Sequence, residues 1–424
     1  MKPSPFLRTW GRFAVLWGPQ TLAITGRGLT TFALGVWVYE RTHSVTLFAL
    51  LEVSGILPGI VAAPLIGWAV DRLGPRPAMV LADSAALAAV LALELAFVYG
   101  IASPLLVYAI ITAGAFLTCL RWPAYTALVT LVAPPDQLPR AAALMQVAYA
   151  GQQVVAPVVA GVLIGVIGPG GVIAIDMAAS IVALASLALV NVRTETIRGA
   201  EVWEDVRRAW RLIGDRGLFR LAGYIIASYL PGGMVIALAT PLVLTIAGPA
   251  ALGLVLAAMG VGMLLGSVAA SALARPEGGI TRLLRYDAML VAAMLGAGFA
   301  TTPVRVALIG AVFLFGLAGV IAEEQAVWQV RIPADVQGRV FALRRAITWI
   351  SLPVSYVIAG PLADHVFVPA MSTGGALVSW LGPIMGTGPG RGIALLLMCG
   401  GLAKGLVVFS GARDRKLRRL DLAA

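Results

Sequence analysis

The sequence contains few of the side chains that carry covalent chemistry or bind metals. Of its 424 residues, two are cysteine, two are histidine and only 12% are charged. Both cysteines, Cys119 and Cys399, fall inside apolar runs, so no disulfide framework is available. The histidines, His43 and His365, belong to no Cys, His and carboxylate cluster with metal-ligand spacing, and we expect neither a metal nor a cofactor.

Two further absences argue against particular classes of function. No phosphate-binding glycine loop followed by Lys and Ser or Thr occurs, which disfavours ATP-driven transport. Serines within apolar runs, such as Ser54 and Ser84, lack a histidine partner at membrane depth. We therefore expect that the protein is not an enzyme. A membrane-embedded enzyme is the alternative class, and it would form product without a gradient.

Long apolar runs, by contrast, are abundant. Apolar residues make up 60% of the chain, and a soluble protein has roughly a quarter of its residues charged, so the shortage of charge indicates a lipid environment. A spanning helix needs about 20 mostly apolar residues, and the runs that meet this length are 13–39, 45–70, 78–100, 104–133, 141–167, 171–192, 219–247, 250–274, 283–301, 304–330, 340–362 and 390–410. Strand-period alternation is absent from them, so the predicted fold is an all-α membrane protein with twelve transmembrane helices. The first run is too long for a signal peptide, and we expect it to remain in the mature protein.

Basic residues are concentrated in alternate connections between these runs. If the N-terminus is cytoplasmic, the cytoplasmic segments contain 25 of the 31 Lys and Arg residues, and the outer segments contain only Arg41, Arg305 and Arg391. This bias predicts a multi-pass protein of the plasma (inner) membrane with both termini in the cytoplasm. The net charge of +11 is then a topology signal with some attraction to anionic lipid, and we expect no nucleic-acid partner.

The two halves of the chain share landmarks. When the chain is shifted by 199 residues, nine positions have the same residue in both halves. The residues of the first half are Gly67, Arg76, Pro77, Pro134, Asp136, Arg140, Leu144, Ala160 and Gly161. Their counterparts in the second half are, in the same order, Gly266, Arg275, Pro276, Pro333, Asp335, Arg339, Leu343, Ala359 and Gly360. We interpret them as two parallel six-helix repeats, 1–192 and 219–424 (the latter with a basic cytoplasmic tail), with a substrate site between them near the midplane. Coincidence among abundant Gly, Pro and Ala is the alternative. The linker 193–218 is predicted to form an amphipathic helix on the cytoplasmic leaflet, or else a solvated helix.

Residues 67–77, Gly-Trp-Ala-Val-Asp-Arg-Leu-Gly-Pro-Arg-Pro, are the most informative stretch. We expect them to form a short charged loop between two apolar runs at the membrane surface. The stretch closely resembles the cytoplasmic loop between the second and third helices of major facilitator superfamily transporters. The resemblance implies that the motif gates the transport path, through Gly67, Asp71, Arg72, Gly74 and Arg76.

The gate is expected to have partners in the second half. Asp335 is a plausible N-cap of the eleventh helix, within the loop 331–339. A carboxylate at Asp71 near that positive helix end would be attracted by the helix dipole and by Arg339. We expect this contact to latch the cytoplasmic side in the outward-open state.

Other segments resemble the macrolide-efflux and siderophore-exporter branch of drug:proton antiporters: 120–124, 175–178, 337–341 and 386–392. In the fifth helix, the segment from Gly151 through Pro157 to Gly161 resembles the glycine-proline-glycine element of these antiporters. Proline removes a helix hydrogen bond and small residues let helices approach, so we expect this segment to bend during exchange. A packing-only role for Pro157 is the alternative.

Charged residues inside the apolar runs are candidates for the transport site. Arg27 and Arg121 lie in the first and fourth runs, which line the central cavity in this superfamily. An unpaired arginine at mid-membrane costs on the order of 3 kcal/mol, so we expect these two to face a cavity or a partner. Our hypothesis is that they present positive charge and that Glu323 or Glu324 presents a titratable carboxylate that exchanges a proton with the substrate. Glu52 is a further candidate for proton coupling.

The structural alternative assigns these charges to static roles. Arg27 and Glu52 would form an ion pair between the first two helices, and Glu323 and Glu324 would lie at the cytoplasmic interface. Asp176 is expected to be structural. We therefore predict a secondary active transporter, a monomer in lipid, that exports an amphiphilic drug, siderophore or secondary metabolite by proton antiport. The alternatives are a proton-coupled uptake carrier and a lipid or lysolipid flippase, and the two arginines favour a substrate with an anionic group.

Overall fold

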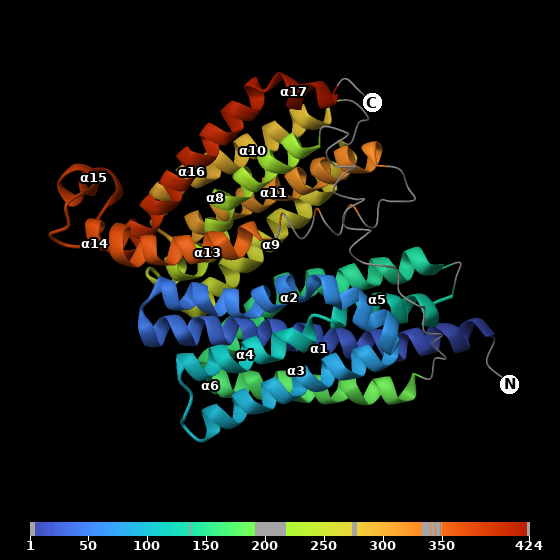
Figure 1. The fold of residues 1–424 in the computed structure, drawn as a ribbon. Coiled ribbons are helices and arrows are strands. Elements are labelled where there is room, and N and C mark those ends of the chain that lie inside the picture. The colour runs from blue at the N-terminus through green and yellow to red at the C-terminus, as the bar shows by residue number, and fades with distance from the viewer. Residues whose placement is uncertain are drawn as a thin grey trace. The chain divides into compact units, whose positions relative to one another are not determined.

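A computed structural model describes residues 5–134, 137–190, 218–273, 278–332 and 350–421 together with positions 340, 344 and 348. Within these ranges the side chains of residues 5–10, 63, 64, 67, 68, 71, 139 and 150 are not described. The described backbone is helical and contains no strand (Figure 1). The prediction of an all-α membrane fold is confirmed.

Helices occupy all twelve predicted positions in the described part of the chain. Among the residues that the structure describes, nine segments are long and apolar enough to cross a membrane. One of these, Arg140–Leu189, contains two spans, because α6 (Leu138–Leu189) leaves helical geometry at Gly168 with φ 68 and ψ 175. The first and ninth positions are occupied by α1 (Pro5–Thr42) and α10 (Gly279–Gly296).

The backbone divides into two compact units. The first comprises Met1–Val38 and Ser54–Val202, and the second comprises Tyr39–Val53 and Trp203–Ala424. The helices of the first half are, besides α1 and α6, α2 (Val45–Leu73), α3 (Pro75–Val98), α4 (Pro104–Thr118) and α5 (Arg121–Val132). Those of the second half are, besides α10, α8 (Phe219–Leu244), α9 (Pro249–Ala272), η2 (Ala297–Phe299), α11 (Pro303–Arg331), α13 (Ser351–Leu362), η3 (Ala363–Phe367), α14 (Val368–Met371), α15 (Val378–Met385), α16 (Pro389–Arg413), α17 (Arg415–Arg418) and η4 (Arg419–Asp421).

The connection between α2 and α3 corrects the prediction of a loop at 67–77. Helix α2 continues to Leu73, and only Gly74 separates it from α3. Gly74 has φ 84, a conformation that favours glycine. Pro75 follows at the first helical position, where its fixed φ suits a helix start. The charges of the motif therefore lie on helix ends.

Two other boundaries differ from the prediction. The run 104–133 is interrupted at Cys119 and Leu120, because Pro123 has no N–H to donate to the carbonyl four residues before it. The segment 363–389, which none of the predicted spans includes, contains η3, α14 and α15 between α13 and α16 (Figure 1). Gly374, Gly386 and Gly388 of this segment lie outside its helices and have positive φ.

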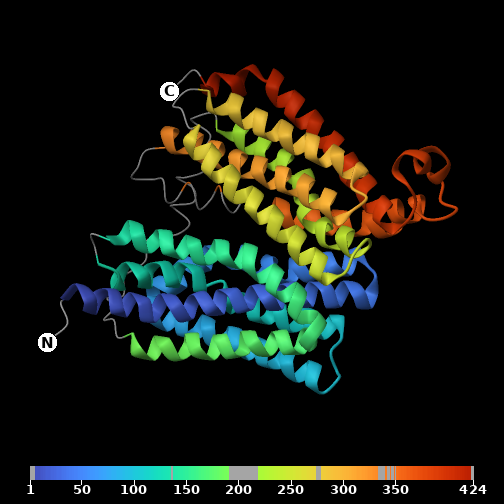
Figure 2. The same ribbon diagram turned by 180° about the vertical axis from the view of Figure 1, so that it is seen from behind.

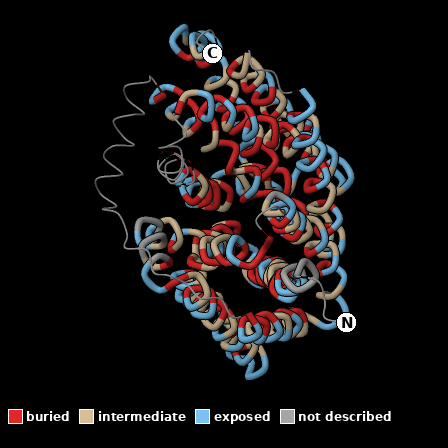
Figure 3. Tube along the Cα trace, turned by 90° about the vertical axis from the view of Figure 1, so that its right-hand side faces the viewer, coloured by how far each residue is buried: buried red, intermediate tan, exposed pale blue. Residues whose placement is uncertain are grey.

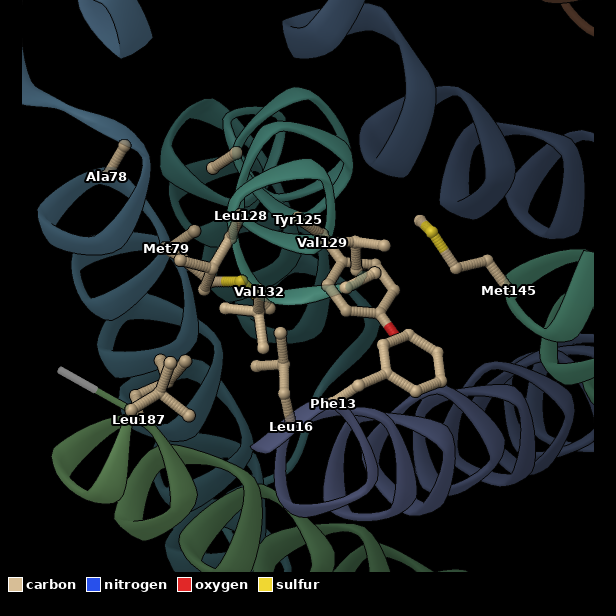
Figure 4. Close-up of a cluster of buried hydrophobic side chains, with 14 of the residues drawn as sticks. Phe13, Leu16, Ala78, Met79, Tyr125, Leu128, Val129, Val132, Met145 and Leu187 are labelled. Carbon is tan, nitrogen blue, oxygen red and sulfur yellow. The ribbon is translucent and has the colours of Figure 1, made fainter. Parts of the chain in front are cut away.

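Each unit packs around its own apolar interior. In the first unit, Phe13, Leu16, Met79, Tyr125 and Leu128 are all at most 1% exposed and pack together (Figure 4). In the second unit, α9 and α11 approach so closely that a Cβ on Gly262 or Gly266 would collide with a carbonyl oxygen of α11. Figure 2 shows the helices of each unit running side by side, and Figure 3 shows the buried positions on the faces they share. Many large apolar side chains remain on the outer faces, as expected for a protein in lipid.

Candidate functional site

A ring of polar side chains lies inside the first unit, between α1, α3 and α5. Gln20 donates through Nε2 to Asp83 Oδ2 at 2.8 Å, and Arg121 donates through Nη2 to Gln20 Oε1 at 2.7 Å. The ring closes because Arg121 Nε lies 3.2 Å from Asp83 Oδ1. Gln20 and Asp83 are almost fully buried, whereas the Arg121 side chain is 11% exposed. The predicted intramembrane cation therefore has an acid of its own unit beside it.

Arg27 also has an acid within its unit. Helix α1 meets the second part of α6 at Gly26, where an added Cβ would lie 3.0 Å from Asp176. Asp176 is fully buried, interacts with Arg27 through charge, and accepts a hydrogen bond from Ser180 Oγ at 3.3 Å. Each of the two predicted intramembrane arginines, Arg27 and Arg121, thus has a buried aspartate that acts on it through charge. This arrangement removes the basis for expecting a preference for anionic substrates.

The two adjacent glutamates of α11 point to different partners. Glu323 forms a two-point ion pair with Arg282, with Nε to Oε1 at 2.6 Å and Nη2 to Oε2 at 3.0 Å. Arg282 lies in the first turn of α10, whose N–H groups at Ile280 and Thr281 are capped by Asp421. Glu323 is therefore held at one end of the bundle, as the structural alternative expects.

Glu324 is held less tightly. It accepts a hydrogen bond from Tyr229 of α8 at 2.8 Å, and its Oε1 lies 3.7 Å from Arg344 Nε. Both glutamates of α11 are only 4% exposed. Because Glu324 has one neutral donor and a single ion-pair contact that is longer than those between Glu323 and Arg282, it is the better placed of the two to gain and lose a proton.

Glu52 belongs to the segment Tyr39–Val53, which groups with the second unit. Its charge interacts with the hydroxyl of Tyr356 on α13. Among the residues that the structure describes, Glu52 forms no ion pair. It therefore stays a candidate for proton coupling.

The gate motif is only partly described. The backbone of Gly67 and Asp71 belongs to α2, but their side chains lie outside the described residues. Arg72 is exposed, and Arg76 donates through Nε to the carbonyl of Leu187 at 3.1 Å, which ties α3 to the end of α6.

The partners of the gate, Asp335 and Arg339, and the linker 193–217 also lie outside the described residues. The latch and the amphipathic linker stay predictions. In the fifth helix, 151–161 is continuous α-helix with Pro157 inside it, so bending between Gly151 and Gly161 also stays a prediction. No group of three or more His, Cys, Asp or Glu side chains that could hold a metal occurs in the described ranges.

Sequence reasoning found the arginines but missed the groups that hold them. Asp83 and Gln20 lie inside apolar runs and were not singled out. An acid within a membrane span is itself a signal of a functional or paired site, and that signal was available for Asp83. Which helix supplies the partner depends on tertiary packing.

Comparison with known proteins gives consistent results. The family profile described as Major Facilitator Superfamily matches residues 16–355. The chain is 24% identical over 376 residues to Macrolide efflux protein A of Streptococcus pyogenes, covering 84% of this chain and 90% of that protein. It is 25% identical over 355 residues to Multidrug efflux pump Tap of Mycolicibacterium fortuitum, covering 80% and 86%.

Solved structures show the same fold. A bacterial homolog of the human lysosomal transporter Spinster, inward-facing, superimposes with a TM-score of 0.71 at 14% identity, covering 99% of both chains. A bacterial homologue of the iron transporter ferroportin, also inward-facing, gives a TM-score of 0.69 at 13% identity, covering 96% of this chain and 99% of that one. At such identities the likeness concerns the fold alone.

Proposed function

This chain belongs to the Major Facilitator Superfamily and is a multi-pass membrane transporter, and we propose that it exports an amphiphilic small molecule by proton antiport. The efflux proteins to which it is similar span most of its length, which supports export of a drug or secondary metabolite. We place it in the plasma membrane with both termini in the cytoplasm, as a monomer surrounded by lipid. Its partners are the substrate and protons.

The observation that carries this proposal is the ion pair of Arg121 with Asp83, together with the charges of Arg27 and Asp176, within the membrane-spanning helices of the first unit. Ionisable residues inside a membrane are costly and usually mark a transport pathway. Arg121 forms an ion pair with Asp83, and Asp176 acts on Arg27 through charge, so the positive charge of both arginines is offset within the unit. Helices whose cations are offset in this way suit a neutral or weakly basic amphiphile better than an anion.

For the proton we propose Glu324. Its partners Tyr229 and Arg344 leave the carboxylate buried but weakly paired, whereas Glu323 is fixed by Arg282. A buried carboxylate near a cation can sit close to the balance between its charged and neutral forms. Protonation from outside and release inside would then drive substrate outward.

The test uses purified protein in liposomes with an imposed pH gradient and radiolabelled erythromycin, a macrolide. Wild type is expected to accumulate the drug against its gradient while the internal pH changes. Glu324→Gln should lose accumulation but keep drug exchange in the absence of a gradient. Glu94→Gln, which changes another intramembrane carboxylate, is the matched control and should behave as wild type.

Three results would contradict the proposal. Wild type that moves erythromycin at the same rate with and without a pH gradient is not an antiporter for protons. Full accumulation by Glu324→Gln would remove Glu324 from the coupling mechanism. Drug movement in the same direction as the protons would indicate uptake in place of export.

A further inference from the structure

A second polar cluster lies deep inside the second unit, between α8, α10 and α16. Lys404 and Asp287 are both 0% exposed, and Lys404 Nζ lies 2.6 Å from Asp287 Oδ1. Two residues of α8 complete the cluster, since Tyr224 and Ser228 (the latter at 2.9 Å) each donate a hydroxyl hydrogen bond to Asp287 Oδ2. None of these residues belongs to the site described above.

Three oxygen atoms lie around the ammonium group of Lys404. Besides Asp287, Lys404 Nζ contacts the carbonyl oxygen of Ser228 at 3.1 Å and also Ser228 Oγ. An ammonium group has three hydrogens, and three acceptors surround it here. Tyr224 and Ser228 present hydroxyls, which can donate to a carboxylate or accept from a protonated acid, so the surroundings fit both forms of Asp287.

The identity of the cation indicates what the cluster can do. An arginine keeps its proton in proteins and binds a carboxylate through a fixed fork of donors, whereas a lysine is a point charge on a flexible stem. A static ion pair needs no such freedom, and burying two charges costs several kcal/mol per ion before their attraction compensates. At zero exposure no solute reaches the pair, and the one ligand that can is a proton.

We propose that Asp287 and Lys404 form a proton-exchange site in the second unit, distinct from Glu324. The inference rests on the proton antiport proposed above, for which it supplies a second site. A proton from water adds to the Asp287 carboxylate, its bond to the Lys404 ammonium is lost, and the cluster gains one positive charge. Loss of that proton to water restores the ion pair, and no other reactant is consumed.

The charged groups around Asp287 link this site to Glu324. Helix α16 contributes Lys404, α8 contributes the hydroxyl of Tyr224, and α11 contributes Glu324, whose charge interacts with that of Asp287. Arg344 in turn lies beside Glu324. Because like charges disfavour each other, a proton on one carboxylate favours ionisation of the other, so that the two sites exchange protons in a coupled way.

Infrared difference spectra of the purified protein in lipid, recorded while the pH is lowered, test the site without using a substrate. Wild type is expected to develop the C=O band of a protonated buried carboxylic acid, and Asp287→Asn should lose that band. In Lys404→Met the band should persist to higher pH, since the cation that favours the carboxylate is gone. Asp83→Asn, which alters the matching acid of the first unit, is the control and should keep the wild-type band.

A band that is unchanged in Asp287→Asn, or that is lost in Asp83→Asn instead, would overturn the proposal. If the single variants do not fold, the double variant Asp287→Leu with Lys404→Met removes both charges and should lack the same band. In the erythromycin assay this double variant should keep exchange and lose accumulation. If wild type shows no gradient-driven transport, the proposed antiport fails, while the infrared band still decides whether Asp287 takes up a proton.

Discussion

The two halves of the molecule hold a buried acid at the same place and neutralise it differently. Asp83 and Asp287 are each the ninth residue of their helix, α3 and α10. Each accepts hydrogen bonds from the first helix of its half, from Gln20 in one and from Tyr224 and Ser228 in the other.

The cation is where the halves differ. Asp83 is paired with Arg121 on α5, the second part of the fourth span, and Asp287 is paired with Lys404 on α16, the last span. The pair of Asp83 and Arg121 is closed into a ring by Gln20, whereas Asp287 is surrounded by two hydroxyls that fit both its charged and its neutral form. A related scaffold can therefore contain a fixed polar ring in one half and the proposed exchange site in the other.

The largest expected effect is on stability, from removing the acid of the fully buried pair. Asp287→Leu leaves Lys404 charged and unpaired at 0% exposure, and we expect it to cost about 3–5 kcal/mol of unfolding free energy. Thermal unfolding in detergent measures this loss. The double variant with Lys404→Met should recover most of it. A single variant as stable as wild type would mean that the pair is not charged in the folded protein.

The second-largest effect on stability is expected at Asp83, and it distinguishes this acid from Asp287. Asp83→Leu also leaves a cation without its carboxylate, but Arg121 is 11% exposed and keeps its hydrogen bond to Gln20. We expect it to cost about 2 kcal/mol, less than the change at Asp287. The same unfolding measurement compares them. Equal losses would remove the distinction between a partly accessible pair and a sealed one.

The sequence predicted the spans and the arginines but not how the charges are paired. Runs of about 20 apolar residues are visible in composition, and each coincides with a helix. The 199-residue shift, however, places Asp83 opposite Arg282. The structure shows why: α2 and α3 are separated by one residue, whereas α9 ends at Ala272 and α10 begins at Gly279. The longer connection displaces the repeat, so the correspondence of Asp83 with Asp287 is hidden.

The sequence pattern also did not determine where the helices end. A charged, glycine-punctuated stretch such as 67–77 is compatible with a loop or with two helix ends around a single residue. The structure has two helix ends, because Gly74 adopts a positive φ and Pro75 then starts α3. This backbone geometry is not visible in the pattern of charges and glycines. Lys404 was overlooked because one charge near the end of a long apolar run resembles the basic residues that flank a span.

A smaller effect on stability is expected from the neutral hydroxyl donors that bind Asp287. Tyr224→Phe removes one of the two hydroxyl hydrogen bonds to Asp287 Oδ2 and leaves that of Ser228. We expect a loss of about 1 kcal/mol in unfolding free energy. The infrared band of the protonated acid should remain but appear at a different pH. If the band appeared at the same pH as in wild type, Tyr224 would not influence the proton site.

The smallest effect is expected from an ion pair at the surface, which provides a reference for the two buried ones. Asp414, just beyond α16, accepts from Arg220 Nη1 at 2.9 Å and from the backbone N–H of Lys416 at 2.8 Å, and the two charged side chains are 27% and 54% exposed. Slight burial raises the pKa of the Asp414 carboxyl, but the Arg220 hydrogen bond and the backbone donors outweigh it and hold the pKa below its ordinary value. Because solvent screens this pair, Asp414→Asn should cost only about 0.5 kcal/mol at neutral pH.

The pH dependence of that small loss has a definite sign. A carboxyl whose folded pKa lies below its unfolded value stabilises the protein at pH above the unfolded pKa, and the contribution is lost as the pH falls through the folded pKa. The unfolding midpoints of wild type and Asp414→Asn should therefore differ at neutral pH and converge in acid, and added salt should reduce the difference at neutral pH. The buried pair of Asp287 and Lys404 is shielded from salt, so the loss in Asp287→Leu should be the same at low and high ionic strength. If salt reduced both losses equally, Asp287 would have to be accessible to water, and the contrast between a sealed pair and a surface pair would be wrong.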